Sequence, residues 1–320
     1  MKKKNIDVQP DAESPPSAVD RFLSSLSLVC RVPLPFSFTF SAARLDFYLP
    51  ITALFQSMLF SLGFAAGAWF FRDLALAALT ALMLQYGAFN LFHFDGLLDT
   101  ADAFLGAFDR EKRFQILKDP RIGVYGIFTA LSYLSFKFLI LVSMMSFLFP
   151  AFAGRASHSI LLSPPLFLLL LFPLAGKTAG SLIPAIYEPA KQEGLGALAA
   201  GSRLRSTMLG FLAALALYLA VPLLLFIFAS PESPIRMNLF IPKDAFWQSS
   251  GFFRWELITF LQLFLFAACL AFLSSLTSGL AIGGLYKKGL GGYTGDSLGA
   301  AIELGELLYL LALFVWIQHS

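Results

Sequence analysis

The amino-acid sequence predicts an all-α, polytopic integral membrane protein. Apolar residues make up 58% of the 320 positions and charged residues only 13%, about half the charge of a typical soluble domain. The mean hydropathy is +0.74. Because the lipid interior offers the backbone no hydrogen-bond partners, only α-helices and closed β-barrels cross a bilayer. The long unbroken apolar runs of this chain favour helices, since barrel strands alternate apolar and polar residues.

We expect seven membrane spans, because a helix needs about 18 to 25 predominantly apolar residues to cross the hydrocarbon core. The predicted spans are 51–71, 74–94, 122–150, 159–187, 207–230, 256–285 and 298–318. Prolines in the fourth span predict kinks or a late helix start. They are Pro164, Pro165, Pro173 and Pro184.

The N-terminal region ahead of these spans divides into two parts. Residues 1–20 begin with basic residues, but polar residues follow instead of an apolar core, so we expect a disordered cytoplasmic tail. Residues 22–40 are apolar but interrupted by Arg31, Pro33 and Pro35, which favours an interfacial or re-entrant segment over a span. The rest of the chain, residues 21–320, is expected to form a single membrane-embedded domain.

Lysine and arginine are distributed unequally between the two sides of the predicted membrane. With the N-terminus in the cytoplasm and seven alternating spans, sixteen of the 23 fall on the cytoplasmic side, five on the other, and two inside spans. This bias predicts a protein of the cell (inner) membrane with its N-terminus inside and its C-terminus outside. It also places the loops 95–121, 188–206 and 286–297 together on the cytoplasmic face.

The strongest candidate site begins with three aspartates, Asp95, Asp99 and Asp102, which directly follow the second apolar run. On a helix of 3.6 residues per turn, these spacings put the three side chains within about 60° of one another. Carboxylates so close repel each other. A Mg²⁺ ion, which takes one or two carboxylates plus substrate phosphates, would remove the repulsion. A solvated helix face is the alternative, but acidic residues beside membrane-grade sequence are usually functional.

Basic residues after the aspartates indicate phosphate binding. Lys118, Asp119 and Arg121 lie at the entrance of the third span beside Gly123 and Gly126, and glycines let the backbone approach a ligand closely. Arginine offers a fork of donors that suits phosphate. An anchor on the cytoplasmic side of the membrane would have the same composition, so both interpretations stay open.

Two further spans carry ionisable residues. A glycine-rich turn leads into the last helix, where backbone N–H groups around Gly295 could cradle a phosphate, although a hinge with Asp296 as its helix cap is the alternative. Asp296 and Glu303 are seven residues apart and share a helix face, so we expect both to join the aspartates of the second span. Lys177 lies inside the fourth span, where a lone lysine needs a partner or a polar cavity.

Together these motifs resemble the cobalamin synthase family, the adenosylcobinamide-GDP ribazoletransferases. They occur in family order over nearly the whole chain. The segments that carry the resemblance are 31–35 (RVPLP), 93–102 (HFDGLLDTAD), 118–123 (KDPRIG), 193–196 (EGLG) and 291–303 (GGYTGDSLGAAIE). Three positions depart from the usual family residues: Phe94 where the family has Leu, Pro120 where it has Ser, and Lys177 where Arg is common.

The resemblance implies a Mg²⁺-dependent membrane enzyme that transfers the adenosylcobinamide-phosphate moiety of adenosylcobinamide-GDP to α-ribazole or its 5′-phosphate and releases GMP. This step is the final nucleotide-loop assembly in cobalamin biosynthesis. The implied metal and pyrophosphate ligands are Asp95, Asp99, Asp102, Asp296 and Glu303. The implied substrate-binding residues are Lys118, Asp119, Arg121, Lys177 and Gly295. His93 is either a general base or a packed histidine one turn from the site.

Two other functions stay open. A CDP-alcohol phosphotransferase also holds metal with aspartates spaced along membrane helices, but its D-G-x-x-A-R opening needs an Arg that is absent after Asp95-Gly96. A carboxylate-based transporter would carry its ionisable groups near the bilayer midplane of several spans, whereas most of those here lie at one edge. No nucleic-acid partner is expected, and the sequence leaves a homo-oligomer open.

Overall fold

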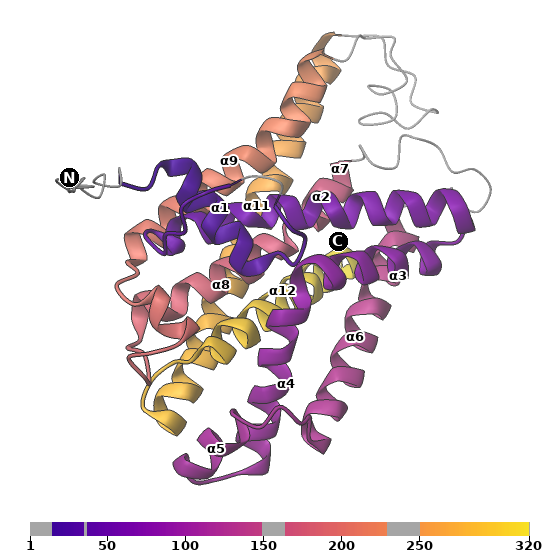
Figure 1. The fold of residues 1–320 in the computed structure, drawn as a ribbon. Helices are drawn as coiled ribbons and strands as arrows, with labels where there is room; N and C mark the ends of the chain where they lie inside the picture. Colours follow the sequence, from indigo (N-terminus) through magenta and orange to yellow (C-terminus); the bar gives the residue numbers. More distant parts are fainter. Residues whose placement is uncertain (1–14, 35–36, 149–163, 229–249, 320) are drawn as a thin grey trace, which may run out of the picture.

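The structure, a computed structural model, describes residues 15–34, 37–148, 164–228 and 250–319 (Figure 1). Every regular element of this part of the chain is a helix. Most of the predicted tail 1–20 lies outside the described residues. The elements are α1 (Ala18–Val29), α2 (Leu45–Phe71), α3 (Leu74–Gln85), the π-helix η1 (Tyr86–Asn90), α4 (Leu91–Gly106), α5 (Arg110–Ile116), α6 (Val124–Leu148), α7 (Pro164–Leu169), α8 (Phe172–Ile186), the 3₁₀ helix η4 (Leu195–Ala199), α9 (Leu204–Phe228), α11 (Ser250–Leu290) and α12 (Gly295–His319).

Seven helices in the described ranges are long and apolar enough to cross a membrane, which confirms the predicted number of spans. Their bounds are Leu45–Phe71, Leu74–Gly106, Val124–Ser146, Phe167–Ile186, Leu204–Leu224, Ile258–Leu290 and Gly295–His319. The second span is predicted to end at 94, whereas its helix continues to Gly106. The aspartates that follow the apolar run keep the spacing of a helix. The aspartates that follow this run therefore lie on the same continuous helix.

The centre of the bundle is α8, and the apolar window of its span is completely buried. It contacts α2, α9, α11 and α12, and Figure 1 shows it among these helices. Gly176 and Gly180 permit the closest of these contacts, since a Cβ at Gly176 would lie 2.6 Å from the Ile302 carbonyl oxygen of α12. The interruption predicted from the prolines is seen between α7 and α8, where Pro173 lies in the first turn of α8. The predicted start of this span at 159 lies outside the described residues.

The N-terminal segment forms the short helix α1 and then an extended stretch, and it does not span the bundle. Ser17 and Asp20 form a capping box at the start of α1. Leu26 and Val29 pack against residues of η1. A π-helix bonds i to i+5 and is frequent at functional sites. Here the backbone N–H of Arg31 donates to the Ala88 carbonyl of η1 at 2.6 Å, which fixes α1 to this irregular turn.

One end of the bundle gathers the loops that the sequence singled out. The C-terminal half of α4, the short α5 and the start of α6 extend to this end, together with η4 and the start of α12 (Figure 1). Two backbone hydrogen bonds join the loop after α8 to the loop before α12. Tyr293 N–H donates to the Glu188 carbonyl at 3.0 Å, and Ala190 N–H donates to the Tyr293 carbonyl at 2.8 Å.

Candidate functional site

The three loops converge on one cavity of about 260 Å³, which we call the polar cavity. Its lining comes from the loop before α6, the loop around η4 and the start of α12. The lining residues are Phe92, Phe114, Leu117, Lys118, Lys191, Glu193, Gly194, Gly196, Ala197, Tyr293, Thr294, Gly295 and Asp296. Lys191 is held beside Phe114, with its ammonium 4.5 Å from the ring centroid. The predicted meeting of the loops is therefore seen in the structure, with two lysines at the cavity wall.

Asp296 lines this cavity, and together with Asp95 and Asp99 of the adjoining α4 it forms what we call the outer acidic cluster. Asp95 is exposed on α4, whereas Asp99 and Asp296 are half-buried. The two helices approach closely because Gly96 has no side chain; a Cβ there would lie 2.7 Å from the Asp296 carbonyl oxygen. Asp95, Asp296 and Asp102 all act electrostatically on Asp99, so the predicted proximity of Asp296 to the aspartates of α4 is observed.

The outer acidic cluster has no ion-pair partner among the described residues. The ion pairs found there are Arg121 with Asp119, and Lys137 with Glu303 and Glu306. The Thr294 hydroxyl donates to Asp296 at 3.1 Å, but a neutral hydroxyl does not offset a carboxylate charge. The three carboxylates therefore repel one another without a direct ion pair in the described part of the chain. Lys191, which lines the polar cavity together with Asp296, offsets part of the charge of Asp296.

Asp102 has a different environment from the other aspartates of α4. It is buried, and its two oxygens accept the backbone N–H groups of Gly123 at 2.7 Å and Gly126 at 2.9 Å. A Cβ at either glycine would collide with the Asp102 carboxylate. Asp102 thus caps the start of α6 and ties it to α4, and the lack of side chains at both glycines permits this contact.

The donor set at the outer acidic cluster fits a hard cation that is shared with substrate. Among the described residues, no group of three or more His, Cys, Asp or Glu is arranged to hold a metal ion by itself. Mg²⁺ seldom needs such a group, because it binds through one or two carboxylates, retained waters and substrate phosphates. Asp95 and Asp99 on α4 and Asp296 on α12 are the carboxylates that could supply these contacts.

Glu303 does not join the outer acidic cluster, contrary to the expectation from its helix face. Seven residues of helix rise by about 10 Å, and this places Glu303 two turns deeper along α12. Its carboxylate accepts hydrogen bonds from Tyr86 at 2.7 Å, Asn90 at 2.9 Å and Tyr133 at 2.7 Å. The π-helix η1 carries Tyr86 and Asn90, both of which are buried.

Glu303 belongs to a second polar group, which we call the deep network. Glu306 receives the Lys137 ammonium at 2.6 Å and the Gln56 amide at 2.6 Å. Lys137 also lies 3.6 Å from Glu303. The members of the deep network, all buried, are Gln56, Gln85, Tyr86, Asn90, Tyr133, Lys137, Glu303 and Glu306. Each carboxylate is thus surrounded by donors and by one lysine of the same chain.

His93 and Lys177 form a buried contact between α4 and α8. The Lys177 Nζ lies 3.4 Å from the His93 Nδ1. Lys177 does not line the polar cavity, so the structure does not place it where the sequence suggested a phosphate. His93 lines a second cavity of about 220 Å³, bounded by α1, α2, α4, α8 and α12, which we call the apolar cavity.

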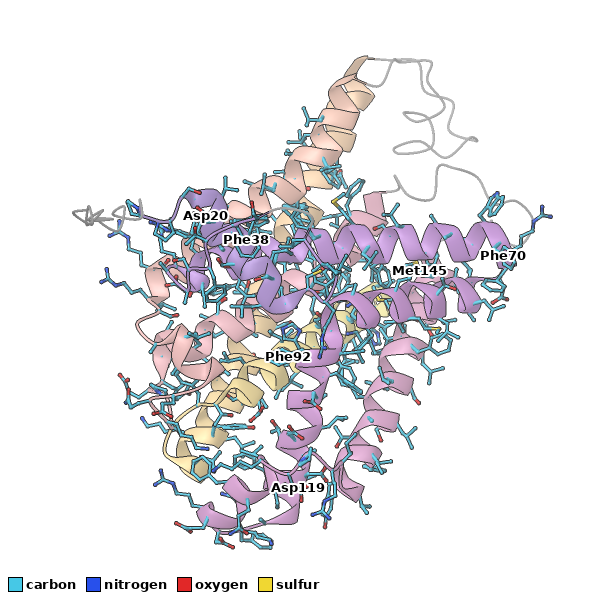
Figure 2. The ribbon with its side chains drawn as sticks, viewed as in Figure 1. Asp20, Phe38, Phe70, Phe92, Asp119 and Met145 are labelled. Carbon is cyan, nitrogen blue, oxygen red and sulfur yellow. The ribbon has the colours of Figure 1, made fainter. Side chains whose placement is uncertain are left out.

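Asp119 and Arg121 pair with each other and do not line the polar cavity. The Arg121 guanidinium donates to both oxygens of Asp119, at 2.8 and 2.6 Å. These hydrogen bonds lower the pKa of Asp119 to about 2. Figure 2 shows Asp119 at the tip formed by α4, α5 and α6, well away from Phe92 at the polar cavity. Of this predicted phosphate-binding group, only Lys118 reaches the cavity.

Sequence reasoning missed several residues that the structure places at these sites. Lys191 lies two positions before the recognised motif 193–196, and its positive charge was a signal for a phosphate-binding residue. Phe92 flanks the motif 93–102, and Tyr293 lies within the motif 291–303, but both look like ordinary aromatic residues in the sequence. Lys137 is an ionisable residue inside a span, which is usually functional or paired, but its partners Glu303 and Glu306 are more than 160 positions away.

Fold and site together define a multi-pass helical membrane protein whose cavity and carboxylate cluster suit a phosphorylated substrate. A sequence model of the cobalamin-5-phosphate synthase family matches residues 21–314, and the chain therefore belongs to this family. This finding confirms the resemblance seen in the motifs.

Curated relatives match over nearly their whole length. The chain is 28% identical over 310 residues to the adenosylcobinamide-GDP ribazoletransferase of Klebsiella pneumoniae subsp. pneumoniae, covering 92% of this chain and 99% of the relative. It is 27% identical over 303 residues to the enzyme of the same name from Escherichia coli O17:K52:H18, covering 91% and 98%. The corresponding Citrobacter koseri protein is 28% identical over 304 residues, covering 91% and 98%. No solved structure matches the chain.

Proposed function

We propose that this protein transfers the adenosylcobinamide-phosphate moiety of adenosylcobinamide-GDP to α-ribazole or its 5′-phosphate and releases GMP. The relatives that match nearly end to end are named for this activity. The observation that carries the proposal is that the outer acidic cluster meets the polar cavity, since Asp296 belongs to both. Carboxylates beside phosphate-binding lysines suit transfer from a pyrophosphate, where catalysis consists of positioning and charge stabilisation.

In this reaction, a ribose hydroxyl oxygen of the acceptor forms a bond to the phosphorus that carries the cobinamide. The bond from this phosphorus to the bridging oxygen breaks, GMP leaves with the electron pair, and the hydroxyl proton passes to a base. Lys118 and Lys191 would hold the pyrophosphate oxygens from two different loops. Their charges offset the negative charge on the leaving GMP. His93 is the candidate base, because it lines the apolar cavity, which adjoins the polar cavity at Phe92 and Gly295.

We propose Mg²⁺ as the cofactor, held by Asp95, Asp99 and Asp296 together with the substrate phosphates. When bound there it would neutralise the pyrophosphate charge and the repulsion among the three carboxylates. Asp102 is assigned to positioning α6, because both of its oxygens already accept backbone N–H groups. Glu303 is assigned to the deep network, whose lysine already offsets its charge.

We propose that the end of the bundle that carries the polar cavity faces the cytoplasm from the inner membrane. The support is the sixteen-to-five distribution of lysine and arginine, since cytoplasmic loops are enriched in these residues. Labelling of single cysteines in intact cells and in inverted vesicles tests this. Positions beside Arg110 and Lys287 should both react only from the cytoplasmic side, and reaction of the two from opposite sides would contradict the topology.

The test of the proposed activity uses the full chain purified in detergent. With adenosylcobinamide-GDP, α-ribazole and Mg²⁺, we expect stoichiometric GMP and nucleotide-loop product, and loss of both when EDTA is added. Absence of GMP release under all metal conditions, together with substrate counterflow in liposomes, would favour a transporter instead. Release of CMP from a CDP-alcohol would favour the phosphotransferase alternative.

A further inference from the structure

The apolar cavity, about 220 Å³ and distinct from the polar cavity, lies along α4 and α12. Its large aliphatic lining residues include Leu28, Leu45, Leu49, Leu298 and Ile302. Sites for drug-sized ligands measure about 300 to 1,000 Å³, so this cavity suits a single ring system.

The polar residues that line the apolar cavity are already satisfied by other partners. The Ser25 hydroxyl donates to the Arg21 carbonyl at 3.0 Å, and Ser181 donates to the Lys177 carbonyl at 3.0 Å. Ser202 donates to the Ala199 carbonyl at 2.7 Å. A ligand with its own hydrogen-bonding groups would therefore lose water partners here without replacing them, which is costly.

Asp46 is the acidic residue of this cavity, and it too is engaged. Its Oδ2 accepts the Arg203 backbone N–H at 2.8 Å, and its Oδ1 accepts its neighbour Phe47 N–H at 2.9 Å. The Asp46 carboxylate therefore faces the backbone N–H group just before α9. Apart from the His93 ring, the surface presented to a ligand is effectively hydrocarbon.

The two cavities are neighbours. Phe92 and Gly295 line both of them. The 3₁₀ helix η4 contributes to both as well, with Ala197 at the polar cavity and Ala199 at the apolar cavity. A ligand that fills the apolar cavity would therefore have its outer end beside Gly295 and Asp296, where the phosphates of a second ligand would lie.

We propose that the apolar cavity binds the aromatic base of the nucleoside acceptor, the benzimidazole of α-ribazole. This inference rests on the proposed function and names which substrate each cavity takes. Guanine and pyrophosphate need many hydrogen bonds and belong in the polar cavity. A flat base rich in hydrocarbon gains by leaving water and needs few partners. With the base seated, the ribose extends past Phe92 and Gly295 toward the outer acidic cluster, which brings its hydroxyl to the phosphorus.

The experiment compares two variants of the same 3₁₀ helix in the purified full chain. Ala199→Leu fills the apolar cavity, and Ala197→Leu is the matched control at the polar cavity. We expect Ala199→Leu to raise the KM for α-ribazole about tenfold, the effect of modest overpacking, with the KM for adenosylcobinamide-GDP changed by less than about twofold. Ala197→Leu should show the reverse pattern.

The loss of affinity can be compared between acceptors whose bases differ in size. A general folding defect would not make this loss depend on the size of the base. An acceptor with unsubstituted benzimidazole, which lacks two methyl groups, should lose much less affinity in Ala199→Leu than α-ribazole does. If Ala199→Leu does not fold, Leu28→Phe is the substitute, because Leu28 of α1 also lines the apolar cavity. It should reproduce this size dependence. Equal losses for both acceptors, or a selective rise in the KM for adenosylcobinamide-GDP, would overturn the assignment. A wild-type protein that makes no product would instead refute the proposed function itself.

Discussion

The outer acidic cluster and the deep network show two ways in which one protein places carboxylates on the same helix. Glu303 and Glu306 are buried, and the chain surrounds them with Lys137 and with the hydroxyl and amide groups of four other helical segments. Asp296, at the start of the same helix, accepts the Thr294 hydroxyl but forms no ion pair among the described residues. Burial requires that charge be compensated within the fold, whereas carboxylates at the edge can remain uncompensated until a cation and its substrate arrive.

The largest expected effect is on stability and comes from the deep network. Lys137→Met would leave Glu303 and Glu306 buried without a counter-charge, and removing one partner of a buried pair costs about 3 to 5 kcal/mol. We expect much lower yield and a large fall in the melting temperature of the detergent-purified protein. The double variant Lys137→Met with Glu306→Gln removes the lysine charge and one of the two carboxylate charges, leaving that of Glu303, and should recover part of the loss. A double variant no better than the single one would mean that Lys137 does not serve as the counter-charge.

The next effect is on activity and comes from the outer acidic cluster. Asp99→Asn is nearly isosteric, so packing should survive while one ligand charge is lost. We expect the transfer rate to fall about 10²-fold or more, comparable to the loss of one electrostatic stabiliser of a transition state, with an unchanged melting temperature. Glu111→Gln, on the exposed face of α5, is the matched control and should alter the rate little. Equal and mild effects of both substitutions would show that the aspartates of α4 form only a polar surface.

An intermediate effect is expected at Asp102, which looks like Asp99 in the sequence but not in the structure. Asp102→Asn keeps one acceptor oxygen but turns the other into a donor that faces a backbone N–H of α6. An unsatisfied buried donor costs about 1 to 3 kcal/mol, so the melting temperature should fall and the rate should fall less than in Asp99→Asn. Thermal unfolding measured beside turnover separates the two. If the Asp102→Asn protein is fully stable but inactive, Asp102 is a metal-binding residue after all.

The smallest effect is expected at the exposed pair of Asp119 and Arg121. The pKa of Asp119 is lowered to about 2, so any stability from the pair is present above the ordinary carboxyl pKa and is lost only as pH falls toward 2. Between pH 6 and 8, thermal unfolding of Asp119→Asn should match the wild type, since exposed ion pairs contribute little. A marked loss of stability in this range would mean that the pair is sequestered rather than exposed.

What the sequence predicted well depends on local pattern. The seven spans follow from apolar length, and the shared face of Asp95 and Asp99 follows from the period of the helix. The meeting of the three loops follows from alternating topology and the distribution of basic residues. Each of these requires only neighbouring positions or a count along the chain.

What the sequence could not predict depends on which helices pack together. The hydrogen-bond partners of Glu303 depend on helix packing, because the π-helix η1 supplies Tyr86 and Asn90, which donate to its carboxylate. The capping role of Asp102 depends on where α6 begins. Neither a π-helix nor a partner more than twenty positions away is encoded in helical periodicity, and so the sequence grouped Asp102 and Glu303 with aspartates from which the structure separates them by their hydrogen bonds.

The measurement that tests the account most directly is the Mg²⁺ dependence of turnover in Asp99→Asn and in Glu303→Gln. Asp99→Asn should shift half-saturation to higher Mg²⁺ and regain part of its activity there, because weakened binding obeys mass action. Glu303→Gln should show the wild-type Mg²⁺ dependence, whatever its stability, since its carboxylate is compensated by Lys137. An equal shift in both variants, or a shift in Glu303→Gln alone, would contradict the division between an outer cluster that binds an external cation and a deep network that does not.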